Sequence, residues 1–319
     1  MNASSSAPEP PVRVLLIAGA GRSGSTLLDR LLGQAQGCVS LGEFFWVWTW
    51  AYGQNQLCGC GAPFRTCPFW QAVLRDAFPE GSAPGPDEMR RLHPLIEGNR
   101  YTPWPGRGRP RADREAYDRG IIAMYRAVRK ISGARWIIDS SKFPVRGFLL
   151  RRLPEFDVRI LHLVRDSRAV AHSWQRRRVR PETGERRSLM PLKGPIRSAL
   201  ASNVASFLVP WLKGPRSPYR RVRYEDLARD PAGTLTGILE WMGESSPDLG
   251  FLRNDRASMK LDHTVAGNPM RFNQGSLEIR QDDEWRREMG AAARCCVTLL
   301  TWPWLLRHGY FGSQTRPPR

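Results

Sequence analysis

Lysine is scarce in this chain: only five of its 49 basic residues are lysine, and the other 44 are arginine. The formal net charge is +19. Such a surplus fits a surface for nucleic acid, an anionic membrane or a polyanionic ligand, or arginines spread over a solvated surface. No sequence motif of a known nucleic-acid-binding fold is present, so we favour a solvated surface for most arginines and expect no nucleic-acid partner.

The sequence also lacks any run of about 20 apolar residues, the length that crosses a bilayer as a helix. We therefore expect no membrane span. The first 11 residues, MNASSSAPEPP, lack the basic and apolar regions of a signal peptide. We expect residues 1–11 to form a disordered tail and the protein to be cytoplasmic, with its six cysteines reduced.

Three of the six cysteines cluster in the segment CGCGAPFRTCPFW, as Cys58, Cys60 and Cys67. Their C-x-C-x6-C spacing is not a standard zinc pattern, although it offers three ligands. His93 or Cys38 is a conceivable fourth ligand. We favour a tight loop, packed and stabilised by glycine and proline, over a metal site.

Short apolar runs alternate with helical patterns along the chain. Residues 12–19 read as a buried strand followed by the helix STLLDRLLGQ, and further strands are expected at 135–141, at 158–166 and at the start of 219–231. Alternating strands and helices predict an α/β fold with a doubly wound parallel sheet flanked by helices. The carboxyl ends of these strands should meet at one edge of the sheet, where ligands bind.

Three segments interrupt this pattern. Residues 52–110 are rich in glycine, proline and cysteine, and residues 176–198 are rich in arginine, proline and glycine. Residues 253–285 show little periodicity and are interpreted as a long loop. No linker divides the chain, so we expect a single domain over residues 12–312, with insertions at about 52–110 and 176–198.

The segment AGAGRSGST, between the first strand and its helix, is similar to a P-loop. Gly19 and Gly24 have the P-loop spacing and Thr26 stands at the hydroxyl position, but Ser25 replaces the lysine that nucleotide triphosphatases use. A glycine-rich turn at a helix N-terminus still cradles an anion through its backbone N–H groups. The missing lysine argues against a triphosphate ligand.

A P-loop kinase or NTPase remains the alternative. Asp139, at the end of the strand WIID, could imitate the residue that holds magnesium in such proteins. The next residues are DSSK, however, and Lys142 beside a metal would be unfavourable. This arrangement suits a metal-free anion site better.

A second anion-binding pair follows the third strand. In VRDSRAVAHSW, Arg165 stands at the end of the strand and Ser173 lies eight residues later in the next helix. Together with GRSGST, this pair makes the chain resemble the PAPS-dependent sulfotransferases (PAPS is 3′-phosphoadenosine 5′-phosphosulfate). The resemblance implies a P-loop-like fold and a 3′-phosphate held by Arg165 and Ser173. It also implies that the 5′-phosphosulfate is held by the loop residues Gly21, Arg22, Ser23, Gly24, Ser25 and Thr26.

Two weaker matches extend the resemblance. The segment VRYEDL is similar to the family segment whose tyrosine packs near the adenine, which makes Tyr224 a candidate. AGNPMRF, followed by DDEW, resembles the late loop that closes over the 3′-phosphate, and Arg271 could supply its basic residue. The family's R-K-G tripeptide is absent from this chain.

The resemblance also suggests a catalytic base. The segment GEFFWVW resembles the Gly-Glu step of the tyrosylprotein and some carbohydrate sulfotransferases, in which the glutamate is the base, so Glu43 is the candidate. Its aromatic neighbours could desolvate the carboxylate and make it a better base. His263 is the second candidate, because many cytosolic sulfotransferases use a histidine.

The expected reaction moves a sulfuryl group from PAPS to an acceptor hydroxyl by in-line displacement and leaves PAP, the desulfated product. Lys142 and Arg22 are expected to stabilise the charge that builds on the leaving phosphate, so no metal is required. The aromatic segment 44–52 is either core or an acceptor-binding wall. We expect a small molecule or a glycoconjugate as acceptor, and the sequence does not indicate an oligomeric state.

Overall fold

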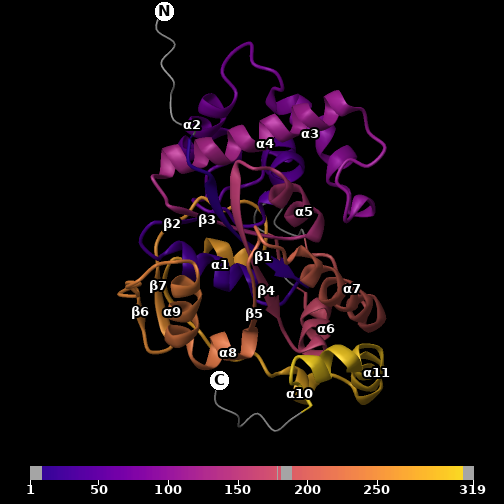
Figure 1. Cartoon of the computed structure of the whole chain (residues 1–319). Helices are drawn as coiled ribbons and strands as arrows, with labels where there is room; N and C mark the ends of the chain where they lie inside the picture. The colour runs from indigo at the N-terminus through magenta and orange to yellow at the C-terminus, as the bar shows by residue number, and fades with distance from the viewer. Residues whose placement is uncertain (1–8, 178, 181–188, 312–319) are drawn as a thin grey trace, which may run out of the picture.

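The computed structural model describes residues 9–177, 179–180 and 189–311. Its centre is a five-stranded sheet with strand order β2-β3-β1-β4-β5, in which every neighbouring pair is parallel (Figure 1). The parallel α/β fold and the single domain are therefore confirmed. The strands are β1 (Val12–Gly19), β2 (Cys38–Ser40), β3 (Trp136–Lys142), β4 (Phe156–Val164) and β5 (Tyr219–Arg223).

The central strand β1 shows why the sheet is covered on both faces. Successive side chains of a strand point to opposite faces, and Val14 and Leu16 belong to one core while Leu15 and Ile17 belong to another. All four are fully buried, so the strand reads as a continuous apolar run. The first core packs against α4 (Arg111–Ser132) and α5 (Pro144–Arg152), and the second against α1 (Ser25–Gly33) and α9 (Pro231–Trp241).

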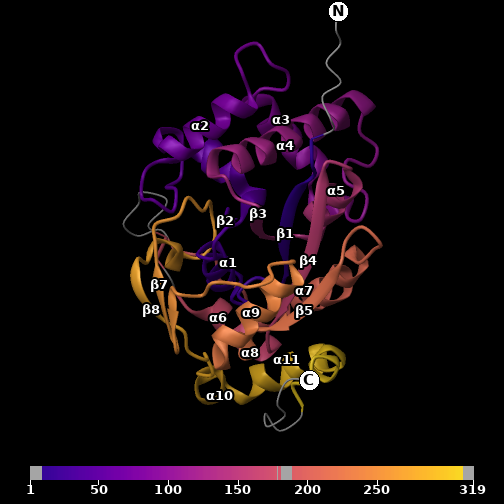
Figure 2. The same ribbon diagram turned by 60° about the vertical axis from the view of Figure 1, so that its left-hand side comes forward.

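The other helices gather at the two ends of the molecule. One group lies with α4 at the end near β2 and β3, and the other lies toward the opposite end (Figures 1 and 2). The first group is α2 (Pro68–Ala77) and α3 (Pro86–Ile96). The second is α6 (Ser167–Gln175), α7 (Pro195–Leu208), α8 (Tyr224–Arg229), α10 (Trp285–Glu288) and α11 (Ala291–Arg307). In this group α10 and α11 pack against α6 and α7.

The expected interruptions differ from the structure in two places. Residues 52–110 contain two helices, α2 and α3, and are irregular over most of the remaining length. Residues 253–285 are only partly a loop: β6 (Leu252–Arg253), β7 (Arg256–Met259) and β8 (Gly275–Glu278) form a small antiparallel sheet over α1, and a long connection joins β7 to β8 (Figure 2). These strands are two to four residues long. Strands so short show no recognisable alternation of apolar and polar residues in the sequence.

The remaining expectations concern the ends and the second insertion. Residues 1–8 of the expected tail, position 178 and residues 181–188 of the second insertion, and residue 312 lie outside the described residues. Glu9 forms ion pairs with Arg126 and Arg129 on α4. Among the helices in the described ranges, none combines the length and apolar character needed to cross a bilayer.

Candidate active site

A cavity of about 1040 Å³ lies at the carboxyl ends of the parallel strands, where ligands bind on sheets of this kind. It is lined by the glycine-rich loop, by the ends of β3 and β4, by α6 and α7, and by the segments 267–270 and 278–284. Most predicted site residues meet here: Gly21, Arg22, Gly24, Ser25, Thr26, Glu43, Lys142, Arg165, Ser173 and Tyr224.

The glycine-rich loop leads into the N-terminus of α1. Gly24 is the N-cap residue with φ of 89° and makes no side-chain cap, and the first turn of α1 begins in the cavity wall, where Gly24, Ser25 and Thr26 lie. A Cβ on Gly24 would lie 2.5 Å from the Tyr224 ring, and one on Gly19 would lie 2.4 Å from the Leu163 carbonyl oxygen. The loop therefore needs glycine for close packing, as an anion cradle does.

Arg22 extends from this loop toward the far side of the cavity. Its guanidinium donates to Sδ of Met190 at 3.2 Å and lies 4.8 Å from the ring centre of Trp174. Lys193, which the sequence reasoning missed, lies 3.9 Å from the same ring centre. Burial lowers the pKa of Lys193, and the positive charges of Arg22 and Lys142 lower it further. The rarity of lysine was the one sequence signal that could have identified it.

Glu43 and Lys142 form an ion pair in the cavity wall, and each side chain is 13% exposed. The backbone places both: Glu43 N–H donates to the carbonyl of Val265 at 2.9 Å, and Lys142 has φ of 69° at the end of β3. A Cβ on Gly267 would lie 3.3 Å from Oε1 of Glu43 and 3.5 Å from Oγ1 of Thr26. The carboxylate and the end of the glycine-rich loop therefore flank the same glycine.

The aromatic segment after Glu43 divides between the two expected roles. It forms the short helices η1 (Phe44–Trp46) and η2 (Val47–Tyr52). Phe44 and Trp48 are fully buried in the core. Trp46 and Trp50 instead line the cavity and stack on each other with ring centres 4.1 Å apart.

Arg165 lies where the sequence placed the second anion site. Its guanidinium donates to the carbonyls of Arg22 and Asp282, pairs with the Asp282 carboxylate at 3.1 Å, and lies 4.4 Å from the Tyr224 ring centre. Burial acts to raise the pKa of Asp282, but Arg165 and Arg176 outweigh it and the pKa is lowered. Arg165 thus already holds an anionic group.

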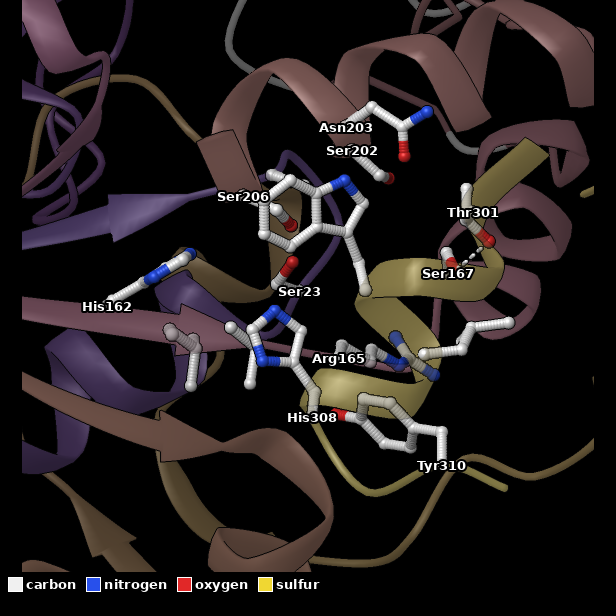
Figure 3. A pocket seen from close by; sticks show the side chains of 15 residues that line it. Ser23, His162, Arg165, Ser167, Ser202, Asn203, Ser206, Thr301, His308 and Tyr310 are labelled. Carbon is white, nitrogen blue, oxygen red and sulfur yellow. Dashed lines mark hydrogen bonds between the residues drawn. The ribbon is translucent and has the colours of Figure 1, made fainter. Parts of the chain in front are cut away.

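Ser23 does not face this cavity. It is 1% exposed and lines a separate polar pocket of about 20 Å³ at the opposite side of the loop, together with Ser202 and His308 (Figure 3). That volume holds about one water molecule. The Ser23 side chain therefore does not reach the cavity that its neighbours Arg22 and Gly24 line.

Arg271, expected to close over the 3′-phosphate, does not line the cavity either. Its side chain is 1% exposed and donates to the carbonyls of Thr264 and Leu57 at 2.8 and 2.6 Å. These hydrogen bonds connect the late loop that contains Arg271 with the first insertion. Arg280, at the end of the small sheet, lines the cavity, and its carbonyl accepts the Tyr224 hydroxyl at 3.1 Å.

His263 is not positioned as a base. Its Nδ1 faces Cys58 and Cys67, and it does not line the cavity. Asp139 is likewise unsuited to hold magnesium. It is fully buried, its Oδ2 accepts the Tyr125 hydroxyl at 2.6 Å, and its Oδ1 accepts the N–H of Ser141 at 2.8 Å.

The fold and the site define an α/β protein with a glycine-rich loop at the N-terminus of its first helix, in the wall of a cavity. The family model described as "Sulfotransferase family" matches residues 15–248. The chain therefore belongs to the sulfotransferase family.

Solved structures give two further likenesses. The chain is similar to the sulfotransferase domain from the Synechococcus PCC 7002 olefin synthase, with 20% identity, 93% of this chain and 95% of that chain covered, and a TM-score of 0.45. It is also similar to the sulfotransferase domain from the curacin biosynthetic pathway, with 16% identity, coverage of 92% and 99%, and a TM-score of 0.47. No curated protein matches the chain.

Proposed function

We propose that this protein transfers a sulfuryl group from PAPS to the hydroxyl of a small molecule or glycoconjugate. One observation carries the proposal: the Glu43–Lys142 ion pair stands in the wall of a cavity that also contains a lysine-free anion cradle and a second arginine site. A proton acceptor and a cation therefore stand beside the place where a phosphosulfate would bind.

The residues of the cavity fit the nucleotide. The uncapped N–H groups of α1, the hydroxyls of Ser25 and Thr26, and Arg22 can bind the 5′ anion. Arg165 and Ser173 can bind the 3′-phosphate. In this structure the Arg165 guanidinium instead pairs with the Asp282 carboxylate. Tyr224, packed against Gly24 and Arg165, offers a ring face near the adenine.

When bound, PAPS supplies the sulfuryl group and a phosphate leaving group. We assign Glu43 as the general base that takes the proton from the acceptor hydroxyl. Lys142 and Arg22 stabilise the negative charge that develops on the leaving phosphate, with Lys193 as an additional cation at the same side. The proposed transfer needs no metal, because these side chains supply the positive charge.

The other part of the cavity suits an acceptor with an apolar portion. Its wall combines the stacked Trp46 and Trp50 with Phe143 and, from α7, Val204 and Leu208. Stacked indoles bind sugar or aromatic faces, and the aliphatic side chains bind hydrocarbon. The acceptor hydroxyl would then reach Glu43 at the junction between this wall and the glycine-rich loop.

A kinase or NTPase function is less well supported. Ser25 stands where such proteins need lysine. Asp139, the one candidate magnesium ligand from the sequence, uses both carboxylate oxygens for Tyr125 and Ser141.

The experiment that tests the function is a transfer assay with sulfur-labelled PAPS and a panel of phenols, sugars and lipid-linked alcohols. We expect labelled product and equimolar PAP with at least one acceptor class, and loss of both with the Glu43→Gln variant. Failure of PAPS to bind or react, together with magnesium-dependent hydrolysis of ATP, would favour the kinase or NTPase function.

A further inference from the structure

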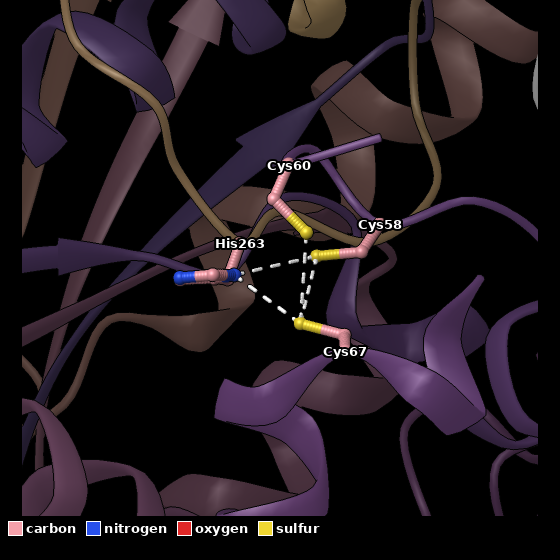
Figure 4. A group of neighbouring side chains, drawn as sticks. All are labelled: Cys58, Cys60, Cys67 and His263. Atoms are coloured by element: carbon pink, nitrogen blue, oxygen red, sulfur yellow. Dashed lines mark hydrogen bonds between the residues drawn. The ribbon is translucent and has the colours of Figure 1, made fainter. Parts of the chain in front are cut away.

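Three cysteines and one histidine meet outside the active-site cavity. Cys58, Cys60 and Cys67 come from the first insertion, and His263 comes from the late loop, nearly 200 residues further along the chain (Figure 4). The four potential ligand atoms all lie within 4.8 Å of one another. His93 and Cys38, the two conceivable fourth ligands from the sequence, do not belong to the cluster.

The distances match a tetrahedral zinc site. Zn–S bonds of about 2.3 Å and Zn–N bonds of about 2.05 Å imply S···S separations of about 3.8 Å and S···N separations of about 3.6 Å. Here Sγ of Cys67 lies 3.7 Å from both other sulfurs, and Nδ1 of His263 lies 3.6 Å from Cys58 and 3.3 Å from Cys67. A disulfide would need about 2.05 Å, and all three cysteines are free.

The position of Cys67 favours a thiolate at one corner of the cluster. Cys67 is the N-cap residue of α2, a helix of ten residues, where the helix dipole favours a negative charge.

The histidine is held in the orientation that a ligand needs. Phe69 stacks on the His263 ring with ring centres 4.7 Å apart, and Trp70 Nε1 donates to the His263 carbonyl at 2.9 Å. Such neighbours fix a ligand and limit access of water. Cys58 and Cys67 are fully buried, while Cys60 and His263 are half-buried.

We propose that the three cysteines and His263 bind one structural zinc ion. Sulfur-rich tetrahedral sites with an imidazole select zinc. Four protein ligands complete its coordination, which makes the site structural, and the bound thiols release their protons. This reverses the interpretation of the cysteines as a packed loop, and it does not depend on the proposed sulfuryl transfer.

The ion would fasten two segments that position the candidate base. Gly59 N–H donates to the carbonyl of Thr264, the residue after the histidine ligand, at 2.9 Å. Val265 then pairs with the backbone of Leu41 and Glu43. Loss of the metal should therefore loosen the strand-like pairing that carries Glu43, as well as the insertion itself.

Elemental analysis of the full chain, purified without chelators from zinc-supplemented cells, tests the site. We expect about one zinc per chain, and replacement by Co²⁺ should give the absorption of tetrahedral, thiolate-ligated cobalt. Cys60→Ser should lower the zinc content at least about fivefold after dialysis against a mild chelator, whereas Cys38→Ser, a cysteine outside the cluster, should retain the metal.

Three results would overturn the proposal. One is a wild-type chain that contains neither zinc nor any other metal and gives no thiolate-to-cobalt absorption on titration. Another is a disulfide between two of the cluster cysteines in the purified protein under reducing conditions. The third is a Cys60→Ser variant that binds zinc as tightly as the Cys38→Ser control. Since the wild-type spectrum needs no variant, the test survives if a substitution prevents folding.

Discussion

The ammonium of Lys142, at the end of β3, pairs with the carboxylate of Glu43, which follows β2. The two strands are adjacent and parallel in the sheet. The pairing of these strands therefore brings the two residues together, although they are far apart in the sequence. It places the proposed base next to the cation proposed to stabilise the leaving group. The predictions below separate these two roles.

The Glu43→Gln substitution removes the proton acceptor while keeping its size. We expect kcat to fall by about 10²–10⁴-fold, the usual contribution of a general base, while the Kd for PAP changes by less than about threefold, since binding uses other groups. Steady-state rates and calorimetry measure the two effects. Glu244→Gln serves as control, because Glu244 is ion-paired with Arg135 outside the cavity. Near-normal turnover in Glu43→Gln would assign the base elsewhere.

Lys142→Met removes the positive charge beside Glu43. We expect kcat to fall by about 10²–10³-fold, because one preorganised group that stabilises transition-state charge contributes this much. Lys142→Arg should recover part of the rate. The exposed Lys213, changed to Met, is the matched control. If Lys142→Met lowered PAP affinity alone and left kcat intact, the role of Lys142 would be binding only.

Arg165 and Asp282 should affect PAP binding in opposite directions. Arg165→Ala should raise the Kd for PAP by about 10–100-fold, the loss of affinity expected when a charge-assisted hydrogen bond is removed. Asp282→Asn removes the carboxylate that now pairs with Arg165, so PAP should bind on the order of threefold more tightly. Calorimetry measures both, with Arg229→Ala, from an exposed surface pair, as control. Weaker binding in both variants would place the 3′-phosphate elsewhere.

The stability should fall at acidic pH through a buried histidine. Burial, together with the neighbouring His308 and Arg221, lowers the pKa of His162 to about 3. In the unfolded chain a histidine has a pKa of about 6.5. Between these values the unfolded state binds a proton that the folded state does not, so the free energy of unfolding decreases as the pH falls.

The slope from one such histidine reaches about 1.4 kcal/mol per pH unit. The pKa of His93 is lowered to about 3 and that of His308 to about 4, both mainly by burial, so they act in the same direction. Urea unfolding across this pH range should show a shallower slope for His162→Gln than for the wild type. Equal slopes would mean that His162 does not take up a proton on unfolding.

Much of the fold could be predicted from the sequence, because the strands of a parallel sheet are long, apolar and bounded by glycine or polar residues. β1 was predicted with its observed bounds, and β3 and β4 within two residues at either end. The three-residue β2 and the small antiparallel sheet were missed, since strands so short are defined by their partners and not by a period in the sequence.

The parts of the candidate site that could be predicted are those whose backbone conformation is determined by a short stretch of sequence. The glycine-rich turn and the strand-end Arg165 bring their side chains to the cavity with little help from distant segments. The late loop could not be interpreted this way: whether Arg271 or Arg280 reaches the cavity depends on the register of β8 and on contacts with the first insertion. The meeting of His263 with the cysteines has the same cause, because only the tertiary fold joins these segments.

The central claim is that the cavity is built for a nucleotide with separate 5′ and 3′ anions and not for a triphosphate with magnesium. Calorimetric titration of the wild-type protein with PAP, and separately with ATP and magnesium, tests it most directly. We predict one PAP bound per chain with a Kd in the micromolar range, about −8 kcal/mol, and at least tenfold weaker binding of ATP with magnesium. Tight, magnesium-dependent ATP binding with no binding of PAP would contradict the account.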